Sequence, residues 1–336
     1  MPATPATTPL LPLATIARRT RQRQRWRRLC QAGFFLLFVL APVFDLFRYD
    51  LLAGHAWLLG FEWRLGLDDF LAGRIGALEA GGRVLLRLFV PLFAGAAVFL
   101  LIARRWGRLY CGWLCPHFSV VESINRSMVR ASGKPSVWEK ELLPPWEADG
   151  TPRRIDRRWW LVVLPVALGF ALSWAVVLLT YLLPPAEVYG NLLGGSLTRN
   201  QGIFIAAATL AFSLEFLFAR HLFCRYACAV GFFQSLVWIG NRRAMVVGFE
   251  RTRGSACNDC LPERAAACDA ACPMRLNPRN VKRHMFACTQ CGQCLDACAD
   301  AQQNNPEGPL LGWISGDRAE RNEAGFRPGN KATRES

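Results

Sequence analysis

Long apolar stretches alternate with arginine-rich segments along the chain. The hydrocarbon core of a bilayer is about 30 Å thick, so a helix needs roughly 20 apolar residues to cross it. Stretches such as residues 159–172 are apolar on every helical face, whereas a helix on a soluble protein keeps one polar face. The pattern therefore predicts four membrane-spanning helices, at about residues 30–47, 85–103, 160–183 and 202–219.

The basic residues predict how these helices are oriented. Residues 1–28 contain seven Arg and no acidic residue, and residues 104–159 contain eleven Lys or Arg, whereas residues 184–201 contain only Arg199. Loops rich in Lys and Arg stay on the cytoplasmic side of a membrane. We therefore expect a multi-pass protein of the cytoplasmic (inner) membrane, with both termini and the 104–159 loop in the cytoplasm.

The overall charge has the same explanation. The 336 residues are 52% hydrophobic and carry a net charge of +15, with Arg concentrated beside the apolar stretches. Nucleic-acid binding is the other common reason for such a charge, but no recognition motif accompanies it. The 13 cysteines lie almost wholly on the predicted cytoplasmic side, where disulfides are rare and thiolates bind metals or carry out redox chemistry.

Candidate chemistry is concentrated in a run of cysteines near the C-terminus. Eight of them lie between Cys257 and Cys298, and from Cys288 onward their spacing is Cys-x-x-Cys-x-x-Cys-x-x-x-Cys. This spacing resembles that of bacterial ferredoxins, in which thiolates two residues apart hold corners of a 4Fe-4S cluster. Zinc also binds paired Cys-x-x-Cys motifs, but one tetrahedral zinc uses only four thiolates.

The resemblance to two-cluster ferredoxins implies how the thiolates divide. In those proteins the fourth cysteine of each motif binds the cluster of the other motif. Carried over, this gives ferredoxin set 1, which is Cys257, Cys260, Cys268 and Cys298, and ferredoxin set 2, which is Cys272, Cys288, Cys291 and Cys294. Each set is expected to bind one 4Fe-4S cluster.

These motifs complete the expected architecture. We predict a mainly α protein, in which a four-span transmembrane helical anchor is followed by a small two-cluster ferredoxin-like domain. The expected divisions are a basic disordered cytoplasmic tail at 1–29, the transmembrane domain at 30–240, the ferredoxin-like domain at 241–305 and a polar C-terminal tail at 306–336.

Two further cysteine pairs each follow a predicted span. Cys111 and Cys115 follow the second span, and Cys224 and Cys228 follow the fourth, each pair after an aromatic residue. The match predicts an internal duplication, and helical thiols at positions i and i+4 share one face. The four thiols, named the membrane cysteine site below, are a candidate third redox or metal site between repeats. A third cluster, copper as Cu(I), or a thiol/disulfide couple are the candidate occupants, and buried unliganded thiols are the alternative.

Four other residues near these spans have candidate roles. Glu215 falls in the cytoplasmic half of the fourth predicted span, where an ionisable group is costly unless it is paired, protonated or hydrated. It is a candidate for proton or quinone binding, and an ion pair with an interfacial Arg is the alternative. His117 and His221 flank the cysteine pairs and are candidates for binding metal or a proton. Cys30, alone at the start of the first span, is expected to be a packing residue.

Several segments together resemble the membrane-anchored 4Fe-4S polyferredoxin superfamily. They are the cysteine pairs within 110–116 and 223–228, the loop at 45–63 and the two ferredoxin motifs. The superfamily includes NapH-type quinol dehydrogenase subunits of periplasmic nitrate reduction and CcoG/FixG-type accessory proteins of cbb-type cytochrome oxidase. Residues 272–279 are more similar to the oxidase accessory type, whereas four spans and a polar tail are more similar to the nitrate-reduction subunit.

The resemblance implies a membrane-bound iron–sulfur electron-transfer protein of a respiratory chain. The leading expectation is reduction of Cu(II), or of another acceptor, during cytochrome oxidase maturation. A quinol-dehydrogenase-type subunit that passes electrons to a periplasmic reductase is one alternative, and a membrane redox sensor is another. Expected partners are the cell membrane, redox donor and acceptor proteins or quinone, and copper, but no nucleic acid. The sequence has no catalytic Ser/His/Asp set, phosphate loop or dinucleotide fingerprint, so whether the chain is itself an oxidoreductase stays open.

Overall fold

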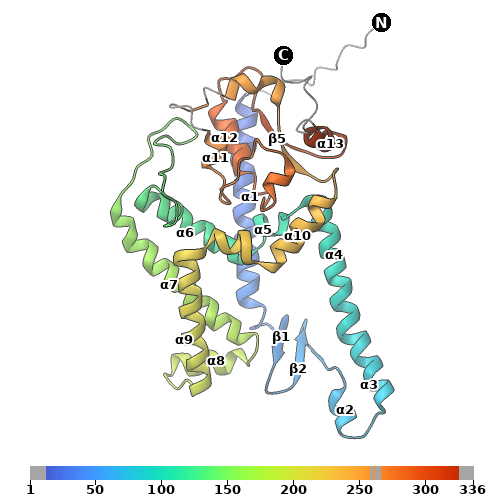
Figure 1. Cartoon of the computed structure of the whole chain (residues 1–336). Coiled ribbons are helices and arrows are strands. Elements are labelled where there is room, and N and C mark those ends of the chain that lie inside the picture. Colours follow the sequence, from blue (N-terminus) through green and yellow to red (C-terminus); the bar gives the residue numbers. More distant parts are fainter. Residues whose placement is uncertain (1–12, 258–259, 262–265, 325–336) are drawn as a thin grey trace.

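The computed structural model describes residues 13–257, 260–261 and 266–324. This part of the chain is mainly helical and contains one three-stranded and one two-stranded sheet. Figure 1 shows the cysteine-rich elements gathered at one end of the molecule, with long helices extending away from them. Helix α1 (Leu13–Leu40) runs from the cysteine-rich end toward the opposite end.

Within the residues that the structure describes, three helices are long and apolar enough to cross a membrane: Ala77–Trp106, Arg157–Thr180 and Arg199–Ala219. They coincide with the second, third and fourth predicted spans. In the most apolar part of helix Ala77–Trp106, no residue is buried inside the molecule. Such an exposed apolar surface is favourable in lipid and unfavourable in water. The three helices comprise α3 (Ala77–Val84), η1 (Leu85–Phe89), α4 (Val90–Trp106), η2 (Arg157–Trp159), α7 (Trp160–Thr180), α9 (Arg199–Leu214) and η3 (Glu215–Ala219).

The first predicted span, 30–47, is not among these helices. Helix α1 ends at Leu40, the chain turns, and strand β1 begins at Phe47. The other half of α1 is the arginine-rich segment, so apolar residues occupy only its second half. A fourth span therefore stays a prediction. Residues 13–29 were expected in a disordered tail, but they belong to helix α1. Arg23 and Arg27 of this segment form ion pairs with Asp296 and Glu122.

Short elements connect the spans at the end opposite the cysteines (Figure 1). The strands form an antiparallel sheet in the order β1-β2-β3. Arg48 is buried there and its Nη1 lies 2.9 Å from Asp50 Oδ2. Helix α9 begins with a capping box, in which Thr198 Oγ1 accepts from the backbone N of Gln201 and the Gln201 side chain accepts from the backbone N of Thr198. These elements are β1 (Phe47–Asp50), β2 (His55–Leu58), β3 (Phe61–Trp63), α2 (Leu67–Leu71) and α8 (Pro185–Leu193).

Two helices follow the second and fourth predicted spans at the cysteine-rich end, and each packs against the helix of another span. Helix α6 (Pro116–Ser132) packs against α7 through Val120, Ile124 and Met128 in one buried apolar cluster. Helix α10 (Ala229–Gly240) packs along α4. Figure 1 shows α4 on one side of α1, and α7 with α9 on the other.

The cysteine-rich elements share one apolar core. Helix α11 packs on α12, and β4 pairs antiparallel with β5, so that Gly248 lies opposite Gly312. Because β5 and α13 belong to this unit, the described part of the predicted polar tail, residues 306–324, is not separate from it. The elements are β4 (Val246–Phe249), η5 (Arg251–Cys257), α11 (Ala267–Ala270), η7 (Lys282–Met285), α12 (Gln293–Ala301), β5 (Leu311–Ile314) and α13 (Asp317–Ala324).

Candidate functional site

The four cysteines of ferredoxin set 2 line a single cavity. Helix α12 supplies Cys294, the loop before it supplies Cys288 and Cys291, and Cys272 comes from the first motif. The loop enters α12 through Gly292, whose φ of +74° is readily adopted only without a Cβ. Apolar side chains, including those of Val247, Met274, Leu276 and Met285, complete the walls. Four thiols in an apolar enclosure fit a 4Fe-4S cluster shielded from water.

The cysteines of ferredoxin set 1 also lie near one another. Cys268 on α11 and Cys298 on α12 belong to the same buried core. Burial raises the thiol pKa of Cys298, and so do the neighbouring Cys260 and Cys257. The pKa of Cys268 is raised by burial, then by Asp269, Cys298 and Cys257. Such charge effects fall with distance, so they require all four thiols to be close. Residues 258–259 and 262–265, which lie between cysteines of this set in the sequence, are outside the described residues.

The membrane cysteine site is formed at two breaks between helices. Cys111 lies in α5 (Leu109–Trp113), which ends before Cys115, and Cys224 lies in the π-helical turn η4 (Phe223–Ala227), which ends before Cys228. Cys115 and Cys228 instead precede α6 and α10, with ψ angles of 116° and 107°. The stretch between the two cysteines of each pair is not one continuous helix, so the condition under which the two thiols would share a helix face is not met.

The four thiols of this site nevertheless influence one another. Burial is the main cause that raises the pKa of Cys111 to about 12, and Cys115 and Cys228 add to it. The pKa of Cys224 is raised by burial and then by Cys115, Cys111 and Cys228. Thiols that resist ionisation become thiolates when a bound metal displaces their protons. All four side chains are half-buried, so the site is neither closed nor fully exposed.

The first cysteine pair of this site packs directly against the loop of ferredoxin set 2. A Cβ placed on Gly112 would lie 2.2 Å from the carbonyl O of Thr289, so the two backbones touch. Trp113 Nε1 donates a 3.1 Å hydrogen bond to the carbonyl O of Gln290. Both acceptor residues lie between the first two cysteines of the Cys-x-x-Cys-x-x-Cys string. The segments that carry the two candidate redox sites are therefore in direct contact through their backbones.

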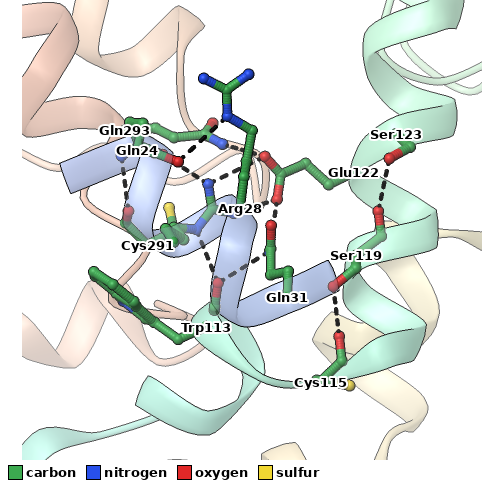
Figure 2. Close-up of polar contacts among 12 residues, drawn as sticks. Gln24, Arg28, Gln31, Trp113, Cys115, Ser119, Glu122, Ser123, Cys291 and Gln293 are labelled. Carbon is green, nitrogen blue, oxygen red and sulfur yellow. Dashed lines mark hydrogen bonds and ion pairs between the residues drawn. The ribbon is translucent and has the colours of Figure 1, made fainter. Parts of the chain in front are cut away.

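A buried polar network holds this junction together (Figure 2). Arg27 of α1 forms an ion pair with Glu122 of α6, and the side chains are 1% and 5% exposed. Arg27 Nε also donates to the carbonyl O of Gly112 at 2.8 Å. Gln293 Nε2 of α12 donates to Glu122 Oε1 at 2.6 Å, and Gln31 Nε2 donates to Glu122 Oε2 at 3.2 Å. The network joins α1, the first cysteine pair and the ferredoxin elements.

Sequence reasoning did not identify this network, because the N-terminal arginines were assigned to membrane topology alone. One signal was available. Glu122 is the only acidic residue between Glu79 and Glu139, and it falls among the apolar positions of a predicted amphipathic stretch. A lone carboxylate on a buried helix face needs a cationic partner.

Glu215 pairs with a histidine rather than with an arginine. Its Oε1 lies 3.0 Å from His117 Nε2, and each side chain is 15% exposed. The His117 ring lies among Phe216, Phe223 and Trp174, with centroid distances of 5.3–5.9 Å. His117 is also the second residue after Cys115, so the pair adjoins the membrane cysteine site.

His221 lies in a different environment. It lines an open groove together with Arg225 and Arg275. Burial lowers its pKa to about 4, and Arg220, Arg275 and Arg225 contribute. The imidazole is therefore neutral at pH 7.

In the part of the chain that the structure describes, no three His, Cys, Asp or Glu side chains are spaced to hold a single metal ion. A structural zinc site draws four donors around one ion. A 4Fe-4S cluster attaches each thiolate to a different iron, so its ligands stand further apart.

A protein-family model described as a 4Fe-4S binding domain matches residues 86–135 and 201–244. Each matched segment contains one pair of the membrane cysteine site. The eight cysteines of the ferredoxin sets lie outside both segments. The match supports 4Fe-4S clusters in this chain.

Known relatives are similar over most of the chain. The ferredoxin-type protein NapH of Escherichia coli is 24% identical over 287 residues, which cover 82% of this chain and 87% of NapH. Protein RdxA of Cereibacter sphaeroides is 25% identical, covering 67% of this chain and 47% of RdxA. The regulatory protein NosR of Stutzerimonas stutzeri is 24% identical, covering 76% of this chain and 29% of NosR. No solved structure matches the chain.

Proposed function

Because the chain is similar to membrane-associated 4Fe-4S polyferredoxins, we propose that it carries electrons between the membrane cysteine site and two ferredoxin-type clusters. The observation that carries this proposal is the contact between Gly112 and Thr289. It brings the backbone of the first membrane cysteine pair against the ligand loop of ferredoxin set 2. Electron transfer between centres is favoured when little protein separates them, and 4Fe-4S clusters supply one-electron steps.

We propose that the three sites follow one another along the molecule. Cys268 of ferredoxin set 1 raises the pKa of Cys294 of ferredoxin set 2, after burial and the other thiols of set 2, so the two sets are neighbours. Set 2 in turn adjoins the membrane cysteine site through Trp113 and Gln290. The proposed order is therefore ferredoxin set 1, ferredoxin set 2 and membrane cysteine site. Set 1 would exchange electrons with a cytoplasmic partner protein, and the chain would lie in the cytoplasmic membrane with both termini inside.

The residues beside the membrane cysteine site favour a quinol as the redox partner at that end of the proposed path. Oxidation of a quinol releases two electrons and two protons, so its site needs groups that accept protons as well as a redox centre. Glu215 and His117 form such a pair beside Cys115, among aromatic rings. The similarity to the ferredoxin-type protein NapH, which covers 87% of NapH, supports electron transfer through 4Fe-4S clusters.

Two other functions remain as candidates. Reduction of Cu(II) during oxidase maturation is favoured by the half-buried thiols, since soft thiolates select Cu(I) and an ion can reach a site that is not closed. A sensing role is favoured by the similarity to a relative that is named a regulatory protein.

The test is reduction of the clusters in membranes by a quinol analogue, followed by absorbance. We expect bleaching in wild type, slower bleaching in Glu215→Gln with unchanged reduction by dithionite, and no bleaching by quinol in Cys111→Ala/Cys224→Ala. In a second experiment, the oxidised protein is first reduced chemically and then mixed with Cu(II), and the formation of Cu(I) is measured. If neither quinol nor Cu(II) changes the redox state of loaded clusters, electron transfer at the membrane site is refuted.

A further inference from the structure

Arg108 is buried between the two candidate redox sites that adjoin each other. Its side chain is 1% exposed. Nη1 donates to the carbonyl O of Cys224 at 2.9 Å, and Nε donates to Ser235 Oγ at 2.6 Å. Ser235 Oγ in turn donates to the carbonyl O of Phe286, two residues before Cys288. One guanidinium therefore contacts the membrane cysteine site and is tied to the ligand loop of ferredoxin set 2.

The space around the guanidinium is closed. A Cβ placed on Gly231 of α10 would lie 2.9 Å from Arg108 Cζ, and the Phe286 ring centroid is 5.9 Å from the same atom. Nη2 is buried and has no hydrogen-bond partner among the described residues. A guanidinium stays protonated in proteins, so this is a permanent positive charge without access to water.

No carboxylate compensates this charge within the described part of the chain. Arg27 is equally buried, but it has Glu122 as ion-pair partner. Burial lowers the pKa of Arg108, and all the groups that raise it are cysteines, namely Cys111, Cys228, Cys224 and Cys288. A buried charge is stable only when an opposite charge or several hydrogen bonds offset it. The groups available to carry that negative charge are thiolates of two different sites.

We propose that Arg108 is a positioning residue that serves as the fixed counter-charge of the membrane cysteine site and of the cluster of ferredoxin set 2. The inference rests on the proposed function, because it requires both sites to hold thiolate-bound redox centres. Four thiolates around a cluster give it a net negative charge, and one-electron reduction makes that charge more negative. A positive charge nearby stabilises the reduced state more than the oxidised state, so it raises the reduction potential.

The experiment is a redox titration of cluster-loaded protein followed by electron paramagnetic resonance. The variants are Arg108→Gln, which removes the charge, and Arg108→Lys, which retains it. Arg105→Gln is the matched control, because it removes one positive charge three residues away at an exposed position. We expect Arg108→Gln to favour the oxidised state of the ferredoxin set 2 cluster at least tenfold, equal to about 59 mV for a one-electron couple. Arg108→Lys and Arg105→Gln should stay close to wild type.

The outcomes separate this inference from the proposed function. If Arg108→Gln loads its clusters and their potentials match wild type, the counter-charge role is overturned. Equal shifts in Arg108→Lys and Arg108→Gln overturn it as well, because the guanidinium would then act through packing. If Arg108→Gln does not load clusters, Arg108→Lys decides: normal loading and potential support the charge, and failure to load refutes it. Absence of a centre at the membrane cysteine site in wild type refutes the shared role, while the shift of ferredoxin set 2 still reports on Arg108.

Discussion

Arg27 on the N-terminal helix and Glu122 on α6 form an ion pair that is almost fully withdrawn from water. The pair lies where α1, the first cysteine pair and α12 meet, and Arg27 also donates to Gly112. Separation of two charges in a buried site is costly, so their geometry fixes the relative position of the three segments. The arginine-rich N-terminus therefore has a structural role besides any effect on topology.

Glu122→Ala is expected to destabilise this junction strongly, because it leaves the Arg27 charge buried without a partner. Removal of one member of a buried ion pair typically costs about 3–5 kcal/mol. The measurement is the temperature at which purified protein loses cluster absorbance, which should fall. The double variant Arg27→Met/Glu122→Leu removes both charges and should recover much of the loss. A double variant as unstable as Glu122→Ala would contradict the ion-pair explanation.

Gly112→Ala is expected to separate the membrane cysteine site from ferredoxin set 2. The added methyl group would lie 2.2 Å from Thr289 O, and a backbone carbonyl cannot yield without movement of its loop. We expect slower reduction of the ferredoxin clusters by a membrane donor, while dithionite still reduces them. Gly169→Ala is the control, since nothing lies within 4 Å of a Cβ at that position. Equal rates in both variants would show that the close contact does not matter.

Cys298→Ala tests the division of the ferredoxin thiolates. Cys298 ends the second motif in the sequence, yet the thiols that raise its pKa, after burial, are Cys260 and Cys257 of the first motif. We therefore expect the variant to lose the cluster of ferredoxin set 1 and to retain that of set 2, as counted by iron content and magnetic resonance. Cys30→Ala, which removes a cysteine outside all three sites, should retain every cluster. Loss of the set 2 cluster alone in Cys298→Ala would refute the crossed assignment.

Lys282 gives the ferredoxin-like unit a dependence on pH. Its Nζ donates to the carbonyl O of Trp238 and of Asn241, each at 2.6 Å. Burial lowers its pKa to about 8, although Glu323 acts in the opposite direction. The unfolded chain, with a lysine pKa near ~10.4, binds more protons than the folded chain between these values. The free energy of unfolding should therefore rise as pH increases from about 8 to ~10.4, by at most about 1.4 kcal/mol per unit.

The control for this prediction is Lys282→Met, which cannot titrate. Urea unfolding of the detergent-solubilised protein at several pH values measures the effect. The stability difference between wild type and variant should shift in favour of wild type as pH rises. A difference that stays constant across the window would show that Lys282 keeps an ordinary pKa.

The sequence alone predicted those features that depend on residues close together in the chain. The length of the apolar stretches predicted the helices Ala77–Trp106, Arg157–Thr180 and Arg199–Ala219, because about 20 consecutive apolar residues match the thickness of the hydrocarbon core of a bilayer. Cysteine spacing and the ferredoxin resemblance grouped Cys272 with the string at Cys288, and all four thiols line one cavity.

The sequence alone did not predict those features that depend on contacts between segments far apart in the chain. The positions of Arg23 and Arg27 depend on their partners Asp296 and Glu122, which lie far along the chain. Residues 311–314 form a strand only because β4 offers an edge to pair with. The breaks before Cys115 and Cys228 follow from turns into α6 and α10, which the i, i+4 spacing of the cysteines does not reveal.

The most direct test of the account is to count redox centres in the loaded protein and in the Cys111→Ala/Cys224→Ala variant. Electron paramagnetic resonance, with iron and sulfide analysis on the same samples, measures the number of clusters. The account predicts two ferredoxin-type clusters in both proteins, and a further thiolate-bound centre in wild type that is absent from the variant. Identical spectra and identical metal content in the two proteins would contradict it.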